Sequence, residues 1–170
     1  MKNIYLIGMM GSGKTTSGRA LAKLLSLPFI DLDDQMVDHE GESINEIFGK
    51  KGEPYFRMVE SELLLEVSQK TDQVLATGGG IVISPSNRER MKNTGMVIYL
   101  KTSLDVLWER VKAKKDRPLL RGADPEKALT ALFNQRTPLY ERCSDKVFLT
   151  DHKSSEAVAL EIYKTYFEKE

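Results

Sequence analysis

The chain has 170 residues, a typical length for one compact domain. Its 25 Lys and Arg residues balance its 25 Asp and Glu residues, so no overall basic field is available to attract nucleic acid or an anionic membrane surface. The hydrophobic content of 41% and the charged content of 29% are typical of a folded globular protein and argue against a disordered chain.

Cysteine content and the N-terminal sequence predict a cytosolic protein. Cys143 is the single cysteine, so it has no intrachain disulfide partner, and neither histidine stands at zinc-ligand spacing from it. The apolar run from Ile4 to Ile7 is too short for the core of a signal peptide or for a membrane span. We therefore expect a cytosolic protein without a membrane partner, and a monomer is the simplest assembly.

Short apolar segments alternate with longer amphipathic ones along the chain, which predicts an α/β fold with a parallel sheet. The predicted strands are short and rich in apolar or β-branched residues, as strands covered on both faces should be. The first helix is predicted from about Gly13 to Ser26, because leucines share one face and Pro28 prevents its continuation. The predicted strands are residues 4–8, 28–31, 74–77, 96–100 and 146–149.

The middle of the chain departs from this alternation. Residues 33–70 contain two or three predicted helices and no convincing strand, and such an excursion often carries substrate contacts. A further helix is predicted where apolar residues recur at i, i+3, i+4 and i+7 from Leu104. Thr102 and Asp105 have capping-box spacing at its start.

Residues 112–124 are predicted to form a mobile surface segment, because basic residues, a proline and a glycine oppose a buried regular element. The next helix is predicted to begin with Asp124 as N-cap and Pro125 in its first position, and to run to about Tyr140. A last helix closes the chain. The lysines of the mobile segment, expected to form a solvated face, are Lys112, Lys114 and Lys115.

The strongest motif is GMMGSGKT at residues 8–15, which matches G-x-x-x-x-G-K-[ST] between a predicted strand and a predicted helix. Its glycines let backbone N–H groups converge on phosphate oxygens, the helix N-terminus adds its positive end, and Lys14 supplies a point charge. Because both flanking elements fit, a chance match is a poor alternative, and we predict a nucleoside triphosphate site. The residues expected to bind the nucleotide here are Gly11, Ser12, Gly13, Lys14, Thr15 and Thr16.

Two aspartates follow the second predicted strand, at the edge of an α/β sheet where ligands bind. Strand alternation predicts that Asp31 and Asp33 point to the same side. Beside a metal-bound triphosphate, one carboxylate can hold a water of the Mg²⁺ shell while the other accepts a proton from a substrate hydroxyl. The alternative is that Asp33 or Asp34 caps a helix, which leaves Asp31 unexplained.

Two arginines are candidates for binding an anion. Arg136 follows Leu132 and Phe133 on the apolar face of its helix, so its guanidinium points inward and needs an anion, either a protein carboxylate or a ligand. Arg57 shares a helix face with Glu60, which could orient it, and a surface ion pair is the alternative.

A run of three glycines follows the third predicted strand. Gly78, Gly79 and Gly80 would let a ligand approach the backbone closely, and a loose turn is the alternative. Thr77 could add a contact to a metal-bound water. Arg117, in the predicted mobile segment, could swing over the triphosphate and neutralise developing charge.

These residues together resemble the shikimate kinase family, and the resemblance covers almost the whole chain. It implies a P-loop kinase with a five-stranded parallel sheet of order 2-3-1-4-5, flanked by helices. Residues 1–170 would form one domain, with the P-loop at 8–15, a helical substrate-binding region at about 33–60 and a lid at about 112–124. The motifs that carry the resemblance are GMMGSGKTT, FIDLDD, GEPYFRMVE, ATGGG, RPLL and QRTPLY.

The resemblance implies ATP-dependent phosphorylation of the 3-hydroxyl of shikimate, a step of aromatic amino acid biosynthesis, with Mg²⁺ as cofactor and ADP as product. By matching position, Thr15 would ligand Mg²⁺ and Asp31 would hold its water shell. Asp33 would bind the shikimate hydroxyls and act as the base.

The resemblance also assigns the remaining contacts. Arg57, Gly79 and Arg136 would bind the substrate, with the two arginines gripping its carboxylate. Arg117, from the lid, would contact the ATP phosphates and, with Lys14 and Asp33, act in catalysis.

The adenine end departs from the family pattern. Family members often carry a D-T-x-x-x-x-P-like loop after the last strand, where this chain has TDHKS at residues 150–154. Lys153 is thus a candidate adenine contact. Arg110, in the last turns of its predicted helix, could stack on the base, with a surface arginine as the alternative.

Other functions fit the motifs less well. Another small P-loop kinase, acting on a hydroxy acid such as gluconate or on a nucleoside monophosphate, explains the P-loop equally well. A nucleotide acceptor requires a pocket for its base, whereas paired arginines with an aspartate suit a small polyhydroxy acid. The sequence has no Asn-Lys-x-Asp segment, which disfavours a GTPase-like switch, and its zero net charge disfavours a nucleic-acid motor.

Overall fold

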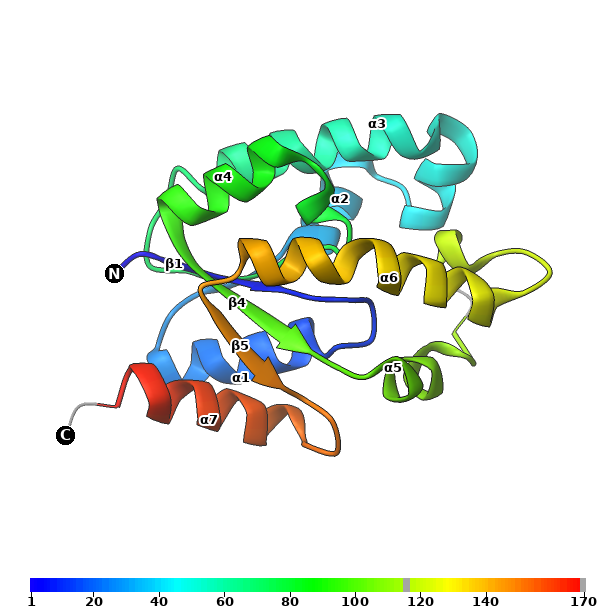
Figure 1. Ribbon diagram of the computed structural model, residues 1–170. Helices are drawn as coiled ribbons and strands as arrows, with labels where there is room; N and C mark the ends of the chain where they lie inside the picture. The colour runs from blue at the N-terminus through cyan, green and yellow to red at the C-terminus, as the bar shows by residue number, and fades with distance from the viewer. Residues whose placement is uncertain (115–116, 169–170) are drawn as a thin grey trace.

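Five parallel strands form one sheet in the order β2-β3-β1-β4-β5, as predicted (Figure 1). The computed structural model describes residues 1–114 and 117–168. All five predicted strands are confirmed, with ends that differ by one residue at most. The strands are β1 (Asn3–Ile7), β2 (Phe29–Asp31), β3 (Val74–Ala76), β4 (Gly95–Lys101) and β5 (Lys146–Leu149).

Helices cover both faces of the sheet (Figure 1). One layer contains α1 (Lys14–Leu25) and α7 (Ser155–Tyr166), which pack against each other. The other layer contains α3 (Ile44–Val67), α4 (Pro85–Thr94) and α6 (Pro125–Cys143).

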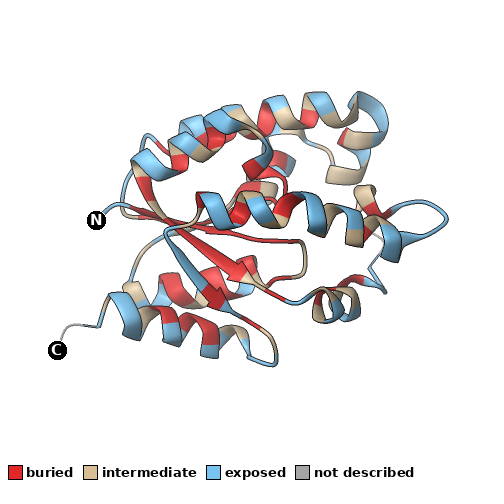
Figure 2. Ribbon diagram, in the orientation of Figure 1, coloured by how far each residue is buried: buried red, intermediate tan, exposed pale blue. Residues whose placement is uncertain are grey.

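The alternation of β1 divides the core between these layers. Tyr5 and Ile7 join the cluster that packs under α3, α4 and α6, whereas Ile4 and Leu6 join the cluster under α1 and α7. Because β1 is central and covered on both faces, all of its residues are buried (Figure 2). The edge strand β5 differs from the prediction, since Val147 and Leu149 are 49% and 61% exposed.

Two predicted helix ends are corrected by the structure. The helix α5 (Leu104–Val111) is capped by Ser103, whose hydroxyl accepts a hydrogen bond from the Val106 N–H. The predicted capping box is therefore wrong, because the Thr102 hydroxyl is paired with that of Thr150 instead. Helix α6 begins at its predicted Asp124 cap but continues three residues beyond Tyr140.

Residues 33–70 form two helices, in agreement with the prediction. Helix α2 (Leu32–Glu40) is followed by α3, which is kinked at Gly52, where φ is 84° and ψ is 169°. Residues 112–124 contain the short 3-10 helix η2 (Pro118–Leu120), and Leu120 is buried, so this segment is not wholly a surface loop. Lys115 lies outside the described residues.

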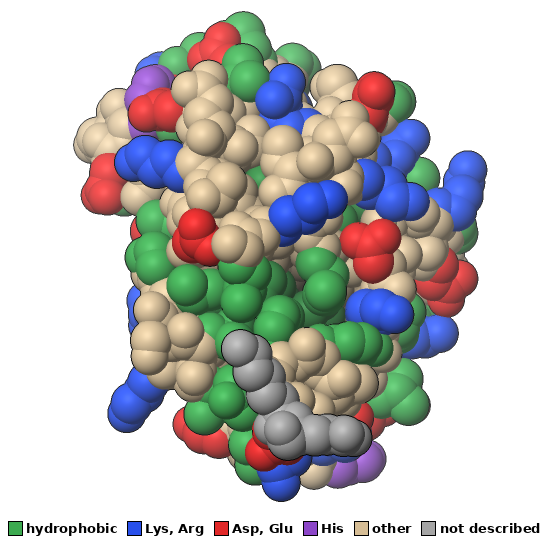
Figure 3. Space-filling view, turned by 90° about the vertical axis from the view of Figure 1, so that its left-hand side faces the viewer, with side chains coloured by type: hydrophobic (Ala, Val, Ile, Leu, Met, Phe, Trp, Pro, Cys, Tyr) green, Lys and Arg blue, Asp and Glu red, His purple; other side chains and the backbone are tan. Residues whose placement is uncertain are grey.

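Apolar side chains gather in the middle of the face at the N-terminal ends of the strands, opposite to the P-loop (Figure 3). Among the described residues, no helix has both the length and the apolar composition needed to cross a bilayer.

Candidate active site

Two pockets open at the carboxyl edge of the sheet and share a wall. The P-loop pocket is lined by the P-loop together with Asp31, Thr77 and Arg110. The arginine pocket is lined by Arg57, Arg136 and the glycines of residues 78–80, with an apolar side formed mainly by α3. The lining residues common to both pockets are Met10, Asp33, Gly79 and Arg117.

The P-loop has the backbone that a phosphate cradle requires. Gly11 and Gly13 have φ values of 81° and 88°, which side chains rarely adopt, and α1 begins directly after them. The Lys14 ammonium donates hydrogen bonds to the carbonyl oxygens of Gly8 at 2.7 Å and Met9 at 2.9 Å. Its burial lowers the pKa of Lys14 from 10.5 to about 8, partly opposed by the charge of Asp33.

Thr15 and Asp31 bring oxygen atoms together in this pocket. The Thr15 hydroxyl donates to Asp31 Oδ2 at 2.6 Å, and Asp31 Oδ1 accepts from the Asp33 N–H at 2.9 Å. Asp31 is therefore the N-cap of α2. The strand alternation predicted for Asp31 and Asp33 is wrong, because the strand ends at Asp31 and Leu32 already begins the helix.

Asp33 lies in the first turn of α2, where it lines both pockets. Burial raises the pKa of Asp33, the negative charge of Asp31 raises it further, and the positive charge of Lys14 opposes the shift. The capping alternative does not hold for Asp33, because its backbone donates to the cap and its side chain faces the pockets.

Arg136 points inward, as predicted, and is only 2% exposed. Its Nε has no hydrogen-bond partner, and no carboxylate in the described part of the chain lies within ion-pair distance of it. Burial lowers the pKa of Arg136. Among the described residues no carboxylate pairs directly with this guanidinium, which favours the ligand alternative of the sequence analysis.

Arg57 is held from two sides on α3. Its Nη1 donates to Glu60 at 3.0 Å and its Nη2 contacts Glu53 at 3.3 Å. The Glu60 side chain is only 4% exposed, so this is not the surface pair considered as the alternative. Burial raises the pKa of Glu60, and the positive charge of Arg57 opposes that shift. Sequence reasoning missed Glu53, although its i,i+4 spacing to Arg57 was visible.

The three glycines let side chains of α3 and α6 approach the loop. A Cβ on Gly80 would lie 2.4 Å from Cζ of Arg57, and one on Gly79 would lie 3.2 Å from Nη1 of Arg136. A Cβ on Gly78 would lie 2.8 Å from Oε2 of Glu60. The side chains of Arg57, Glu60 and Arg136 thus approach the backbone where the glycines lack a Cβ. The same glycines line the arginine pocket, so a ligand there can also approach them.

Thr77 and the predicted lid also meet the P-loop pocket. The Thr77 hydroxyl donates to the Leu6 carbonyl oxygen at 2.8 Å. Arg117 lines both pockets, and its buried Nε has no hydrogen-bond partner among residues 1–114 and 117–168. Lys112 and Lys114 are exposed, as predicted. Lys112 pairs with Glu109, and Lys114 borders the P-loop pocket.

The predicted adenine contacts lie beside the P-loop in a third hollow, which Ser12 and Thr16 also line. Arg110 is half-buried and donates from Nη1 to the Gly11 carbonyl oxygen at 2.9 Å, so it is not a free surface arginine. Lys153 lines the same hollow and pairs with Glu161 at 2.8 Å.

The arrangement suits group transfer between two bound molecules. The P-loop pocket presents amides and Lys14 to an anionic chain, while the arginine pocket presents two guanidinium groups to a second anion. Asp33 lies where the pockets meet, within reach of both.

Comparison with known proteins gives consistent matches over the whole chain. The family model for shikimate kinase matches residues 10–167. The shikimate kinase of Legionella pneumophila (strain Corby) is 48% identical over 164 residues, which cover 96% of this chain and 94% of that protein. The shikimate kinase of Thermodesulfovibrio yellowstonii is 42% identical and covers 98% of this chain and 95% of its own.

A solved structure agrees with these sequence matches. Shikimate kinase from Acinetobacter baumannii, in complex with shikimate, has a TM-score of 0.94 and 38% sequence identity. The match covers 99% of this chain and 96% of that chain.

Proposed function

The chain belongs to the shikimate kinase family, and we infer that it transfers the γ-phosphoryl group of ATP to the 3-hydroxyl of shikimate. The products are shikimate 3-phosphate and ADP, and the reaction is a step of aromatic amino acid biosynthesis. The observation that carries this conclusion is the common wall of the two pockets, where Asp33, Gly79 and Arg117 would adjoin both substrates.

The arginine pocket supports shikimate as the acceptor. Arg57 and Arg136 come from different helices and can each offer a planar fork to one carboxylate. The buried, unpartnered Nε of Arg136 supports a ligand as its anion, since a buried charge without a partner is costly. Asp33 would accept hydrogen bonds from the ring hydroxyls.

Thr15 and Asp31 fit a Mg²⁺ ion bound with the nucleotide. The hydroxyl and the carboxylate already meet at 2.6 Å in the P-loop pocket, and oxygen atoms are the ligands that Mg²⁺ prefers. We propose that Thr15 would bind the ion and Asp31 its water shell. When bound, Mg²⁺ supplies positive charge that neutralises the phosphate oxygens.

Asp33 is the proposed proton acceptor. The substrate hydroxyl oxygen bonds to the γ-phosphorus, its proton passes to the Asp33 carboxylate, and the leaving oxygen of ADP keeps the electron pair of the broken P–O bond. Burial raises the pKa of Asp33 towards neutrality, and a base is more effective when its pKa lies nearer the operating pH.

Alignment of the two reactants and stabilisation of the transferred group's charge account for most of the proposed rate enhancement. Phosphoryl transfer has a loose transition state, so holding the two reactants in line is worth about 7–11 kcal/mol at best. Lys14 and Arg117 would stabilise the charge that develops on the transferred group. Closure of residues 112–124 as a lid would exclude water, which competes for the phosphoryl group.

We propose that the protein acts as a monomer in the cytosol. The residues proposed to bind the nucleotide phosphates, Mg²⁺ and shikimate all meet within one copy of the chain, so the proposed chemistry needs no second copy.

The test is an ADP-release assay with shikimate, gluconate and nucleoside monophosphates compared side by side. We expect turnover with shikimate and none above background with the other acceptors, because only shikimate offers a ring-borne carboxylate to the paired arginines. Saturation by ATP without modification or binding of shikimate would contradict the proposal.

A further inference from the structure

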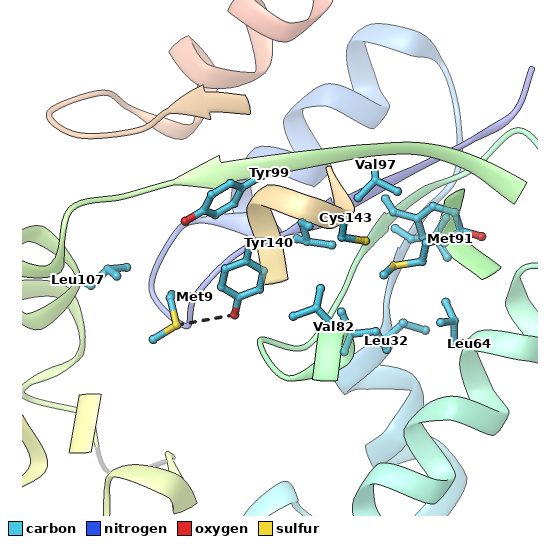
Figure 4. Packing of buried hydrophobic residues seen from close by; sticks show 14 of the residues in the cluster. Met9, Leu32, Leu64, Val82, Met91, Val97, Tyr99, Leu107, Tyr140 and Cys143 are labelled. Atoms are coloured by element: carbon cyan, nitrogen blue, oxygen red, sulfur yellow. Dashed lines mark hydrogen bonds between the residues drawn. The ribbon is translucent and has the colours of Figure 1, made fainter. Parts of the chain in front are cut away.

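Tyr140 connects three parts of the site through one side chain. It lies one turn after Arg136 on α6 and is fully buried. Its hydroxyl donates a hydrogen bond to the carbonyl oxygen of Gly79 and lies 3.7 Å from Met9 Sδ (Figure 4). Its ring stacks on that of Tyr99 with centroids 5.1 Å apart. Helix α6, the glycine loop of residues 78–80 and the P-loop therefore meet at this hydroxyl.

The hydrogen bond from Tyr140 holds the Gly79 carbonyl group in one orientation. In the described part of the chain, the N–H groups of Gly78, Gly79 and Gly80 donate no hydrogen bond. A peptide group is planar and trans, so holding the Gly79 carbonyl also fixes the Gly80 N–H, which points the opposite way. The carbonyl oxygens of Gly78 and Gly80 accept hydrogen bonds from the N–H groups of Ile81 and Ile83, so the Gly79 peptide group is the part of the loop that Tyr140 holds.

The same contact also bears on Arg136. A Cβ on Gly79 would lie 3.2 Å from Nη1 of Arg136, so the loop backbone forms one side of the space that the guanidinium occupies. Burial raises the pKa of Tyr140 far above its ordinary value, so its hydroxyl stays protonated and able to donate at neutral pH.

We propose that Tyr140 is a positioning residue for shikimate binding, whose hydroxyl holds the Gly79 peptide group and thereby aligns the glycine loop with Arg136. It acts through Gly79 and Arg136 and does not touch the substrate. This inference rests on the proposed function, because its readout is the affinity for shikimate.

The direct test is Tyr140→Phe, which removes the hydroxyl and keeps the ring. We expect the KM for shikimate to rise about five- to tenfold, as for the loss of one buried hydrogen bond, and the KM for ATP to change by less than about twofold. The matched control is Tyr99→Phe, which removes the hydroxyl of the other ring in the same stack. Its KM for shikimate should stay within about twofold of the wild type.

A second pair of variants separates hydrogen bonding from folding. Tyr140→4-methylphenylalanine fills the volume of the hydroxyl without a donor, whereas Tyr140→4-aminophenylalanine restores a donor. We expect the amino variant to recover most of the affinity for shikimate and the methyl variant not to. Equal KM values in these two variants, or a lowered melting temperature of Tyr140→Phe with an unchanged KM for shikimate, would overturn the inference. Failure of the wild type to phosphorylate shikimate would overturn the proposed function instead.

Discussion

At the scale of single residues, the site is built from charges that are largely withdrawn from water. Lys14 and Arg136 are buried and Asp33 is partly buried, and each has a pKa displaced in the direction that opposes its charge. Ligand binding relieves this cost, since an anionic ligand favours the charged form of both cations. Mutations at these positions should therefore act on ligand affinity and turnover more than on folding.

Asp33→Asn should leave ATP binding nearly intact and lower turnover by at least about 100-fold, because the amide cannot accept the proton of the substrate hydroxyl. The measurement is kcat in the ADP-release assay, with ATP affinity measured by calorimetry. Turnover close to the wild type would show that Asp33 is not the base.

Arg136→Lys should raise the KM for shikimate strongly and leave the KM for ATP unchanged. The ammonium keeps the positive charge but loses the planar fork that a carboxylate engages through two hydrogen bonds. Steady-state kinetics with each substrate varied in turn provide the measurement. An unchanged KM for shikimate would assign Arg136 a structural role.

The affinity for ATP should fall as the pH rises above about 8, the pKa of Lys14 in the free protein. A bound triphosphate raises that pKa because it favours the ammonium, so binding above this pH requires the uptake of a proton. Below it the ammonium is already formed, so Lys14 contributes no pH dependence there. Calorimetric titrations with ATP at pH values below and above the pKa of Lys14 measure how steeply the affinity falls with pH.

Lys14→Arg is the control for that titration, because its guanidinium stays charged throughout the range. If the affinity of this variant for ATP falls with pH as steeply as that of the wild type, a group other than Lys14 is responsible.

At the scale of elements, the kink of α3 decides where Arg57 lies. The helix bends at Gly52, and the residues that follow carry Glu53, Arg57 and Glu60 to the arginine pocket. The φ of 84° and ψ of 169° at Gly52 fall in a region that is essentially restricted to glycine.

Gly52→Ala should destabilise the fold by about 1–3 kcal/mol, because alanine is strained in this backbone conformation. The KM for shikimate should rise, because the backbone would shift to relieve that strain and would move Arg57. Gly49→Ala is the matched control in the same helix, since an added Cβ there meets no atom within 4 Å. It should be neutral or stabilise by about 0.5–1 kcal/mol. Thermal unfolding of both variants distinguishes them, and equal melting temperatures would contradict the role of the kink.

At the scale of the whole molecule, the parallel sheet brings distant segments to one edge. The loop after β1 supplies the P-loop, the end of β2 supplies Asp31, and the loop after β3 supplies the glycines. Helices α3 and α6 add the two arginines. This is the edge at which open α/β sheets bind ligands. Because the two pockets share a wall, binding of either ligand should increase the free energy of unfolding of the same folded unit.

Saturation with ADP at about 100 times its dissociation constant should stabilise the fold by about 2.7 kcal/mol, which corresponds to a melting temperature about 5–10 °C higher. Shikimate should add a further increase. In Arg136→Lys, the shift with shikimate should largely vanish while the shift with ADP remains. Equal shifts with shikimate in the variant and the wild type would place its binding elsewhere.

The sequence by itself determined the fold class, the strand order through its family resemblance, and most of the polar residues that line the two pockets. The P-loop, the inward direction of Arg136 and the helix start at Asp124 depend on glycines, periodicity and caps, which act between near neighbours in the chain. Local patterns of this kind were sufficient because the physical cause lies within one element and its ends.

Only the tertiary structure decided which groups meet. The bond from Thr15 to Asp31 and the place of Lys114 in the P-loop pocket depend on how the elements pack. The contact between Tyr140 and Gly79 joins residues 61 positions apart. Sequence periodicity predicts which face of an element is buried, but the partner on that face is chosen by the packing of helices on the sheet.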